Sequence, residues 1–433
     1  MSRRHNAPIL RENAEMSTAH AQLPTLTVEN TTLPSGSLWR KFPLIGFAVG
    51  IISLVIAFVV APTNPTDHGE GHTQFYFSYL TSLMFWASIG LGSLFFVLIQ
   101  HGTRAGWSIV VRRIFENWMA TLPVFLVLII PVILGMGDLY HWSHEAAVAE
   151  DFLLQHKEPY LNSTGFIIRA FIVIGIWSAL ALMYYRRSTA QDRTRDEELS
   201  RKMRWWAPLG FVFFALSLSV AAMDWMMSLD PHWYSTIYSI YYFAGGLMAS
   251  GAAVILAAMA LQKAGVLRGA ITTEHYHDLG KWSFAFMVFW AYAAVSQFLL
   301  IWYANIPEET IFYGHRLSGG WDAVTILLPV LKFAIPFWFL MSRHVKRNRM
   351  LLALGAGTLL LGHYVDMFWL IQPNMSIALG QEHSHFGLHI ADLLALVGIG
   401  GIVVGTFAWL TARAPTAPVG DPRLQESLRF ENQ

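Results

Sequence analysis

Residues 222–238 read Ala-Met-Asp-Trp-Met-Met-Ser-Leu-Asp-Pro-His-Trp-Tyr-Ser-Thr-Ile-Tyr, and this stretch lies midway along the apolar part of the chain. An apolar helix is expected to arrive at Asp224. The pair Asp230-Pro231 predicts a tight turn, because proline fixes its own φ and lacks the N–H that a continuing helix needs. A second apolar helix is expected to leave at once. The stretch therefore predicts a helical hairpin with three ionisable groups at one membrane surface, namely Asp224, Asp230 and His232.

The composition is typical of a polytopic membrane protein. Of 433 residues, 55% are hydrophobic and only 13% are charged. A soluble protein of this length carries roughly twice that share of charge. The chain has no cysteine, which excludes disulfides, covalent c-type haem, cysteine-ligated iron–sulfur clusters and thiol catalysis. No glycine-rich phosphate loop or dinucleotide fingerprint is present, so any redox cofactor is expected to be non-covalent or held by a partner.

Ten apolar runs are long enough to cross a bilayer, since a crossing takes ~20 residues of helix. Five precede the central turn and five follow it. The expected spans are residues 43–61, 73–100, 118–136, 165–185, 205–229, 232–262, 281–303, 320–342, 349–371 and 386–412. Several runs exceed the minimum, which indicates tilt or helix ends that project into solvent. The expected fold class is therefore all-α, with ten transmembrane helices.

Four segments follow from these spans. Residues 1–42 form a polar arm in which no apolar period is visible until near Pro43. Residues 43–229 hold helices one to five, and residues 230–412 hold helices six to ten. Residues 413–433 form a polar tail.

Lysine and arginine predict the orientation, because they are enriched in cytoplasmic connections. All but four of the 29 basic residues lie in the two tails or in connections on the same side as the tails. The exceptions are Lys157 and Arg316 in the opposite connections and Arg169 and Lys332 inside helices. Both termini are therefore expected in the cytoplasm, with the Asp230-Pro231 turn outside.

Two connections have features of their own. Residues 103–117 mix apolar side chains with Arg104, Arg112 and Arg113. This pattern fits an amphipathic helix along the cytoplasmic interface, and it fits equally well the start of the third span. On the opposite side, the long acidic connection 137–162 is a candidate docking surface for an extracytoplasmic partner.

Ionisable groups within the spans are the candidate functional residues, because charge in hydrocarbon costs several kcal/mol and is usually paired or functional. With ~1.5 Å of rise per residue, Lys332 falls near the middle of the membrane and the other groups fall in its outer half. His363 and Asp366 share a helix face because they are three residues apart. The candidate proton pathway comprises Lys332, His363, Asp366, Asp224 and Arg169. Four of these residues are expected to form one polar cluster in the outer half of the membrane: Asp224, Arg169, His363 and Asp366. Lys332 would extend this cluster toward the cytoplasm.

Each of these groups also has a purely structural interpretation. Arg169 can reach the headgroups and pair with an outer acid. Asp224 can cap the outer end of its bundle. Lys332 can pair with a facing acid without carrying a proton, and His363 can be a neutral ring bonded to a backbone carbonyl.

The start of the tenth span holds a weaker candidate. His385, His389 and Asp392 share a helix face with spacing that is compatible with a metal site. Because no further pair of helix ligands accompanies them, no metal is expected there. A b-type haem between helices needs two deep, facing histidines, and only His363 is clearly deep.

The chain is rich in aromatic residues, with 17 Trp, 29 Phe and 15 Tyr. Most are expected in interfacial belts and helix packing. A quinone needs an aromatic-lined slot with one or two titratable groups at its head, and quinol oxidation needs a base for each proton. The candidate quinone-head region comprises polar groups expected at the outer surface, Asp138, His141, Asp224 and His232.

The sequence also resembles a known family. Met-Met-Ser-Leu-Asp-Pro-His-Trp-Tyr-Ser-Thr-Ile-Tyr at 226–238 resembles the central hairpin of the NrfD-like (polysulfide reductase C-like) membrane subunits of alternative complex III. That complex is a bacterial quinol:cytochrome c, or high-potential iron–sulfur protein (HiPIP), oxidoreductase. Three further segments are similar to its smaller, ActF-type subunit: His-Thr-Gln-Phe-Tyr-Phe-Ser-Tyr-Leu at 72–80, Gly-Asp-Leu-Tyr-His-Trp at 137–142 and His-Tyr-Val-Asp-Met-Phe-Trp at 363–369.

The resemblance implies two four-helix bundles, helices two to five and helices six to nine, flanked by the first and tenth helices. It implies a bacterial inner membrane and four kinds of partner: a larger NrfD-like subunit, an iron–sulfur subunit, and multihaem and monohaem c-type cytochromes. Haem and iron–sulfur centres would then lie on those partners, and menaquinone is the expected quinone. No nucleic acid partner is implied.

Three hypotheses for function follow. The first is a membrane subunit of a respiratory complex that contributes to quinol oxidation, to a transmembrane proton pathway, or to both. The second is a scaffold subunit of that complex with no quinone site. The third is a secondary transporter, since ten helices in two halves is a transporter-like count. The transporter hypothesis is weakened because the two halves show no clear pair of interrupted helices at matching positions. Only a weak correspondence is visible, between Pro123 and Pro131 in the third span and Pro329 and Pro336 in the eighth.

Overall fold

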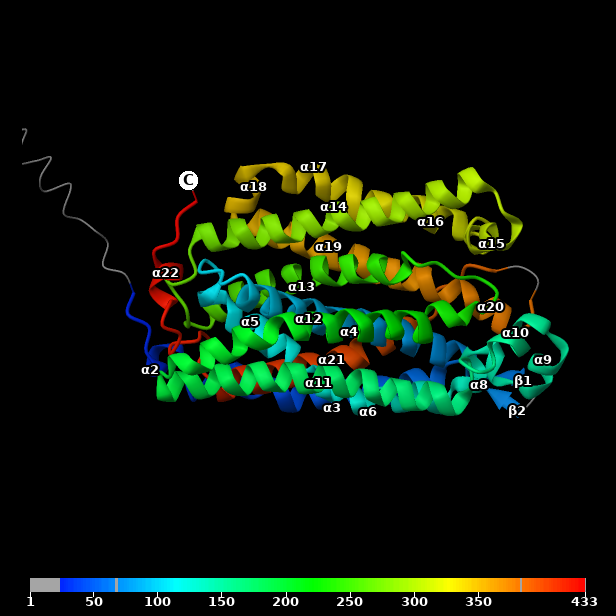
Figure 1. Ribbon diagram of the computed structural model, residues 1–433, viewed down its shortest axis with the longest axis horizontal. Coiled ribbons are helices and arrows are strands. Elements are labelled where there is room, and N and C mark those ends of the chain that lie inside the picture. The colour runs from blue at the N-terminus through cyan, green and yellow to red at the C-terminus, as the bar shows by residue number, and fades with distance from the viewer. Residues whose placement is uncertain (1–23, 67–68, 382–383, 433) are drawn as a thin grey trace, which may run out of the picture.

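The computed structural model describes residues 24–66, 69–381 and 384–432. Part of the expected N-terminal arm, residues 1–23, lies outside the described residues. Within the described part, ten helical segments are long and apolar enough to cross a membrane. They run side by side along the long axis of the molecule (Figure 1). The end that carries α2 (Val28–Thr31) and α22 (Leu424–Leu428) is called the terminal end here, and the opposite end is called the loop end.

The first half contains five spans. They are α3 (Phe42–Val60), α4 (Thr73–Gly102), an interrupted third span, α11 (Ser163–Thr194) and α12 (Glu197–Trp225), which η4 (Met227–Leu229) prolongs. The third span is built from α5 (Ile109–Met119), η2 (Leu122–Val124), α6 (Phe125–Leu128) and α7 (Ile130–Leu134). At the loop end lie the short antiparallel pair β1 (Asn64–Thr66) and β2 (Gly69–Gly71), and then α8 (Met136–Leu139), η3 (His141–Ser143), α9 (Glu145–Glu150) and α10 (Phe152–Lys157).

The second half contains the other five spans. They are α13 (Tyr238–Lys263), α14 (Thr273–Ala304), the eighth span, α19 (Arg349–Ile371) with its continuation η6 (Gln372–Asn374) and α20 (Met375–Ala378), and α21 (Ile390–Arg413). The eighth span is built from α16 (Trp321–Pro329), the π-helical turn η5 (Val330–Ala334) and α17 (Ile335–Met341). Short elements complete the chain: η1 (Leu38–Arg40), α15 (Pro307–Arg316) and α18 (Arg343–Arg347).

Helices α4 and α13 form the centre of the molecule. In each, 83% of the apolar segment lies inside the protein, against 17% for α3. A side chain at Gly92 on α4 would collide with the carbonyl oxygen of Gly246 on α13, so glycine permits the close approach of the two backbones. Helix α4 also contacts α5, α11 and α12, whereas α13 also contacts α14 and α19. Helix α3 packs along α21, and α21 packs against α4.

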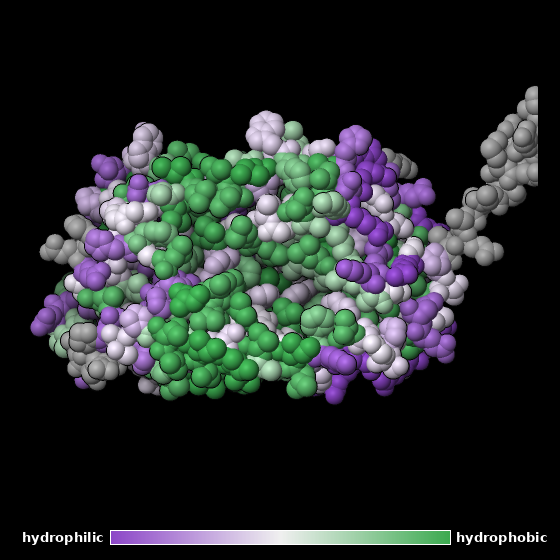
Figure 2. Space-filling model, turned by 180° about the vertical axis from the view of Figure 1, so that it is seen from behind, coloured by the Kyte–Doolittle hydropathy of each residue, from purple (hydrophilic) through white to green (hydrophobic). Residues whose placement is uncertain are grey.

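The outer surface fits a lipid environment around the middle of the molecule. Figure 2 shows apolar side chains gathered in a broad band, with polar side chains at both ends. On α3, the least buried of the ten spans, large apolar side chains face outward: Leu44 is 78% exposed and Val59 is 74% exposed. The chain is therefore an all-α polytopic membrane protein, and the expectation of ten spans is confirmed.

The central turn is confirmed, but the helix after it starts later than expected. The N–H of Trp233 donates to the carbonyl oxygen of Asp230 at 3.2 Å, which closes the turn. Helix α13 begins only at Tyr238, so the expected start of the sixth span at residue 232 is wrong. Trp233 stacks on Phe312 of α15 with ring centroids 4.2 Å apart, and its indole N–H donates to Glu309. These contacts hold residues 232–237 outside the helix.

Residues 103–117 do not form a helix along the interface. Helix α5 starts at Ile109, and every one of its residues is buried inside the protein. Of the two interpretations of this stretch, the structure therefore favours the start of the third span. The apolar side chains of α5 pack against other helices, and its arginines pair with acids.

Prolines interrupt the helices of both the third and the eighth span. From the sequence, these prolines showed only a weak correspondence between the two halves. Pro123 lies in the 3₁₀ turn η2, and Pro329 directly precedes the π turn η5. Proline removes a helical N–H and clashes with the preceding turn, so both spans change their hydrogen-bond register at these points. The interruptions fall in the third span of each half.

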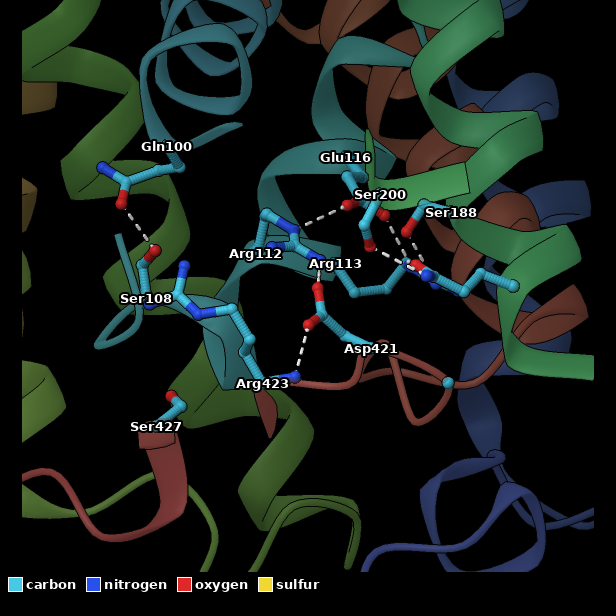
Figure 3. A network of polar contacts seen from close by, with 12 residues as sticks. Gln100, Ser108, Arg112, Arg113, Glu116, Ser188, Ser200, Asp421, Arg423 and Ser427 are labelled. Atoms are coloured by element: carbon cyan, nitrogen blue, oxygen red, sulfur yellow. Dashed lines mark hydrogen bonds and ion pairs between the residues drawn. The ribbon is translucent and has the colours of Figure 1, made fainter. Parts of the chain in front are cut away.

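The C-terminal tail is built into the fold rather than projecting from it. Arg112 on α5 pairs with Asp421 of the tail at 2.6 Å. Arg113 pairs with Glu116 at 2.7 Å and with Asp192 on α11 at 2.8 Å. Figure 3 shows how these groups, together with neighbouring serines, join three segments at the terminal end. The tail therefore covers the basic residues of α5.

Candidate functional site

A buried ion pair lies at the interruption of the eighth span. The ammonium group of Lys332 in η5 contacts the carboxylate of Asp366 on α19, and neither side chain is exposed at all. The sequence placed Lys332 deep in the membrane and Asp366 on the next span, but it did not pair them. A charge pair in this setting is stable only when both partners and their remaining hydrogen bonds are satisfied.

Helix packing makes room for the lysine. A Cβ on Gly362 would lie 3.0 Å from the Cα of Lys332, and a Cβ on Gly245 would lie 3.2 Å from its Nζ. The π turn η5 also widens the backbone at this point, and such turns are common at functional positions. Two glycines from neighbouring helices and one widened turn therefore position the Lys332 side chain.

Four further side chains, His363, Ser88, Tyr241 and Trp290, complete this site, which is called the Lys332 cluster here. His363 lies with its Nδ1 3.1 Å from the Lys332 Nζ and its Nε2 2.8 Å from the hydroxyl oxygen of Ser88 on α4. The Tyr241 hydroxyl on α13 donates to the Asp366 carboxylate. The Trp290 ring of α14 lies 4.2 Å from the Lys332 Nζ, a cation–π distance. His363 thus bonds to side chains and not to the backbone carbonyl that the structural interpretation gave it.

An aromatic cavity opens beside the Lys332 cluster. Its volume is about 380 Å³, which falls in the range of small-molecule sites. Tyr241 and Trp290 belong both to the cluster and to the cavity wall. The rest of the wall is mostly apolar and includes Phe298, Tyr313, Ile326, Leu328, Trp369 and Leu370.

Two polar atoms of this wall make no hydrogen bond of standard geometry among the described residues, although the Trp290 side chain also interacts with Asp366 and Tyr241 and the Gln297 side chain with Tyr313. The two atoms are the indole Nε1 of Trp290 and the amide Oε1 of Gln297. The two residues are only 2% and 5% exposed, and an unsatisfied buried polar group costs ~1–3 kcal/mol. One atom is a donor and the other an acceptor, which fits a flat ligand with two hydroxyl groups, one that accepts and one that donates.

Asp224 and Arg169 form a second, separate pair. The Arg169 Nε lies 2.6 Å from an Asp224 carboxylate oxygen. Tyr160 donates to the other carboxylate oxygen at 2.8 Å, and burial together with this carboxylate raises the pKa of Tyr160 to about 12. In the part of the chain that the structure describes, no hydrogen bond or ion pair joins them to the Lys332 cluster. The expectation of one outer cluster is therefore wrong, because α12 and α19 present their acids to different neighbours.

The expected quinone-head residues are not gathered at one site. Asp138 on α8 accepts from Thr73 at 2.9 Å, and His141 lies in η3. The His232 Nε2 lies 2.5 Å from Asp151, and this hydrogen bond lowers the pKa of the Asp151 carboxyl group. A pocket of about 390 Å³ adjoins the central turn, but its lining includes none of the four expected residues.

The start of the tenth span serves to cap a helix. His389 and Asp392 form a capping box at the N-terminus of α21. The Asp392 carboxylate also accepts from Ser78 at 2.6 Å and from Gln372 at 3.1 Å. His385 takes no part in this capping box. Among the described residues, no group of three His, Cys, Asp or Glu is arranged to hold a metal ion.

Arg316 has a role that sequence reasoning missed. It is 1% exposed, and its guanidinium donates to the carbonyl oxygens of Trp369 and Leu370 in the last turn of α19. Burial lowers the pKa of Arg316 to about 10, and the partial negative charge of the helix C-terminus favours the cation there. From the sequence, Arg316 was noted only as one of the two basic residues in the connections on the side opposite the tails, and no role was predicted for it.

Comparison with known proteins adds no family. No family model matches this chain, and no curated protein is significantly similar to it. The Lys332 cluster, the aromatic cavity and the resemblance described above are therefore the features that bear on function.

Proposed function

We propose that this chain is a membrane subunit of a quinol-oxidising respiratory complex in a bacterial inner membrane, with both termini in the cytoplasm. The aromatic cavity would hold the ring of a quinone, menaquinone by the resemblance, and the Lys332 cluster would take up its protons. The observation that carries this proposal is the position of Tyr241. Its ring lines the cavity while its hydroxyl donates to Asp366.

The residues of the cavity fit the ring of a quinone. Trp290 can donate its N–H to one hydroxyl oxygen of the quinol, and the Gln297 amide oxygen can accept from the other hydroxyl group. A bound quinol supplies two protons and two electrons, and the electrons would pass to iron–sulfur or haem centres on the partner subunits. The resemblance implies such partners, and a chain without cysteine is consistent with redox centres that lie on them.

The Lys332 cluster supports proton transfer by its charge balance. A proton that reaches Asp366 through Tyr241 removes the negative charge that stabilises the ammonium of Lys332. The buried ammonium is then without a counter-charge, which favours loss of its proton. Besides Asp366, the ammonium contacts the His363 Nδ1 at 3.1 Å, and the other nitrogen of that ring contacts Ser88 on the central helix α4. A short chain of groups thus leads from the cavity wall into the centre of the molecule.

The first experiment is purification in mild detergent through a tag on this chain, followed by haem spectra and mass spectrometry. Co-purification of c-type haem and an iron–sulfur protein supports the complex. A colourless, solitary chain of 48.8 kDa contradicts it.

The second experiment separates a proton role from a scaffold role. The double variant Lys332→Met and Asp366→Asn removes both charges together, so it leaves no unpaired charge in the interior. We expect the complex to assemble with its redox centres and to oxidise quinol at least roughly tenfold more slowly, since a lost general base costs ~10²–10⁴-fold. Glu274→Gln with Arg347→Gln, an ion pair at the terminal end, is the matched control. Unchanged turnover in the Lys332 and Asp366 variant would favour the scaffold.

A secondary transporter is the second candidate, because one observation favours it. The third span of each half is interrupted at proline, and the interruption of the eighth span carries Lys332. Interrupted helices at matching positions of two halves are typical of substrate sites in transporters. Uptake of a solute by proteoliposomes that contain only this chain would support this function over the respiratory one.

A further inference from the structure

Another cavity lies at the terminal end, and it shares no lining residue with the aromatic cavity. Its volume is about 400 Å³. Three parts of the chain line it: the end of α4 with the start of α5, the first turns of α12, and the C-terminal tail. The tail closes one side, because the Arg423 guanidinium donates to the carbonyl oxygen of Arg104 at 2.5 Å. The tail contacts of Figure 3 border this cavity, and we call it the arginine cavity.

The lining of the arginine cavity has a surplus of positive charge. Five arginines line it, Arg104, Arg112, Arg201, Arg204 and Arg423, against three acids, Glu197, Glu198 and Asp421. Some of these charges are matched. Arg112 pairs with Asp421 at 2.6 Å, Arg201 pairs with Glu198, and Arg423 pairs with Glu426 outside the lining.

Arg104 and Arg204 are the unmatched arginines, and Glu197 is the one lining acid without an ion pair among the described residues, so one net positive charge remains; the charge of Arg104 also acts on Glu426. Neither arginine side chain has a hydrogen bond or an ion pair with any of the described residues. The two residues lie on different segments, the α4–α5 connection and the second turn of α12. A group bound between them would meet two guanidinium ions, which bind the oxygens of phosphate and carboxylate groups through paired N–H donors.

A buried ring nitrogen inside the cavity points to a ligand independently of the charge. His101 on α4 lines the arginine cavity and is 7% exposed. Its Nε2 is buried without a hydrogen-bond partner among the described residues. A buried polar atom without a partner is uncommon in native structures, and an oxyanion in the cavity would satisfy it.

We propose that the arginine cavity binds a phosphate ester, held by Arg104 and Arg204 with His101 as a further donor. The phosphate can come from an anionic phospholipid headgroup or from a soluble phosphate ester. The surroundings resemble a headgroup site, because Trp205, which is 71% exposed, follows Arg204 in α12. Tryptophan is enriched at membrane interfaces, and basic pockets between transmembrane helices bind anionic headgroups.

The test uses the delipidated full-length chain in detergent and native mass spectrometry. Three probes are compared: dioleoylphosphatidylglycerol, dioleoylphosphatidylcholine and sn-glycerol 3-phosphate. We expect phosphatidylglycerol to bind more tightly than phosphatidylcholine, whose quaternary ammonium adds a positive charge to a positive cavity. The double variant Arg104→Gln and Arg204→Gln should weaken binding by roughly tenfold or more, as expected for lost hydrogen bonds to a charged group.

Two further variants keep the test decisive. Arg193→Gln removes the same charge from an exposed residue of α11 outside the cavity and should leave binding unchanged. His101→Phe preserves the ring and removes the donor, so it should weaken binding while both arginines remain. Binding of sn-glycerol 3-phosphate that is lost in the same variants supports the site with a soluble occupant. No preference for either phosphate probe over phosphatidylcholine, or an equal loss in Arg193→Gln, would overturn the proposal.

Discussion

Replacing Lys332 by methionine should destabilise the protein far more than the loss of one side-chain contact would. Both partners of the Lys332–Asp366 pair are fully buried. Removing one partner leaves a buried charge without compensation, which costs ~3–5 kcal/mol. Methionine fills a similar volume, so packing adds less than ~1.5 kcal/mol. Because Asp366 keeps the hydrogen bond from Tyr241, we expect a loss near the lower limit, about 3 kcal/mol.

A double-mutant cycle turns this expectation into a measurement. Lys332→Met, Asp366→Asn and the double variant are unfolded by titration with sodium dodecyl sulfate in mixed micelles, with tryptophan fluorescence as the readout. Because the double variant leaves no unpaired charge, it should be more stable than the sum of the single effects by at least ~2 kcal/mol. The matched pair Glu274 and Arg347 is partly exposed, so its coupling should be only ~0.2–1 kcal/mol.

The result that would refute this reasoning is additivity. If the single effects at Lys332 and Asp366 add within ~0.5 kcal/mol, the two groups do not interact in the folded protein. The charge-balance argument for proton transfer would then lose its basis.

Three further predictions follow from named contacts. Gly245→Ala would place a Cβ 2.9 Å from the His363 ring, so it should lower stability by ~1–3 kcal/mol in the same titration, and unchanged stability would show that α13 moves aside. Arg113→Met leaves Asp192 without its arginine and leaves Glu116 paired with Arg112 alone, and it should cost ~3–5 kcal/mol, whereas a loss below ~1 kcal/mol would contradict a buried pair. Burial opposes the charged form of Asp421, but the Arg112 guanidinium lowers the pKa of this carboxyl group below its usual 3.8. A carboxyl group whose pKa is lowered on folding adds stability above its unfolded pKa and loses it as the pH falls through the folded value. The difference in unfolding free energy between wild type and Asp421→Asn should therefore shrink below pH 3.8, and a constant difference would contradict the pair.

Several features of the fold could be predicted from the sequence because they depend on neighbouring residues only. The number of spans follows from the lengths of apolar runs, which are set by bilayer thickness. The central turn follows from Pro231, which fixes φ wherever it occurs. Helix ends were less predictable, since contacts from distant segments decide them. The chain stays non-helical up to Tyr238 because Trp233 stacks on Phe312, a residue far along the chain.

The candidate site was predictable only in part, for the same physical reason. Local apolarity and spacing singled out Lys332, His363 and Asp366 as unusual groups in the membrane, because each is charged or polar within an apolar run. Their partners lie on other helices, and the sequence contains no local signal for Ser88 or Tyr241.

Pairing, cavities and ordered tails were decided by tertiary structure. Asp366 pairs with Lys332 rather than joining Asp224, because glycines let α13, α19 and the eighth span approach closely around the lysine. The arginines of α5, which in sequence only indicate orientation, are buried because the C-terminal tail supplies an acid to one of them. Hydropathy is a property of each segment by itself, so the sequence alone determined which segments enter the membrane. Which side chains meet depends on how separate helices pack, and that is determined only when the whole chain folds.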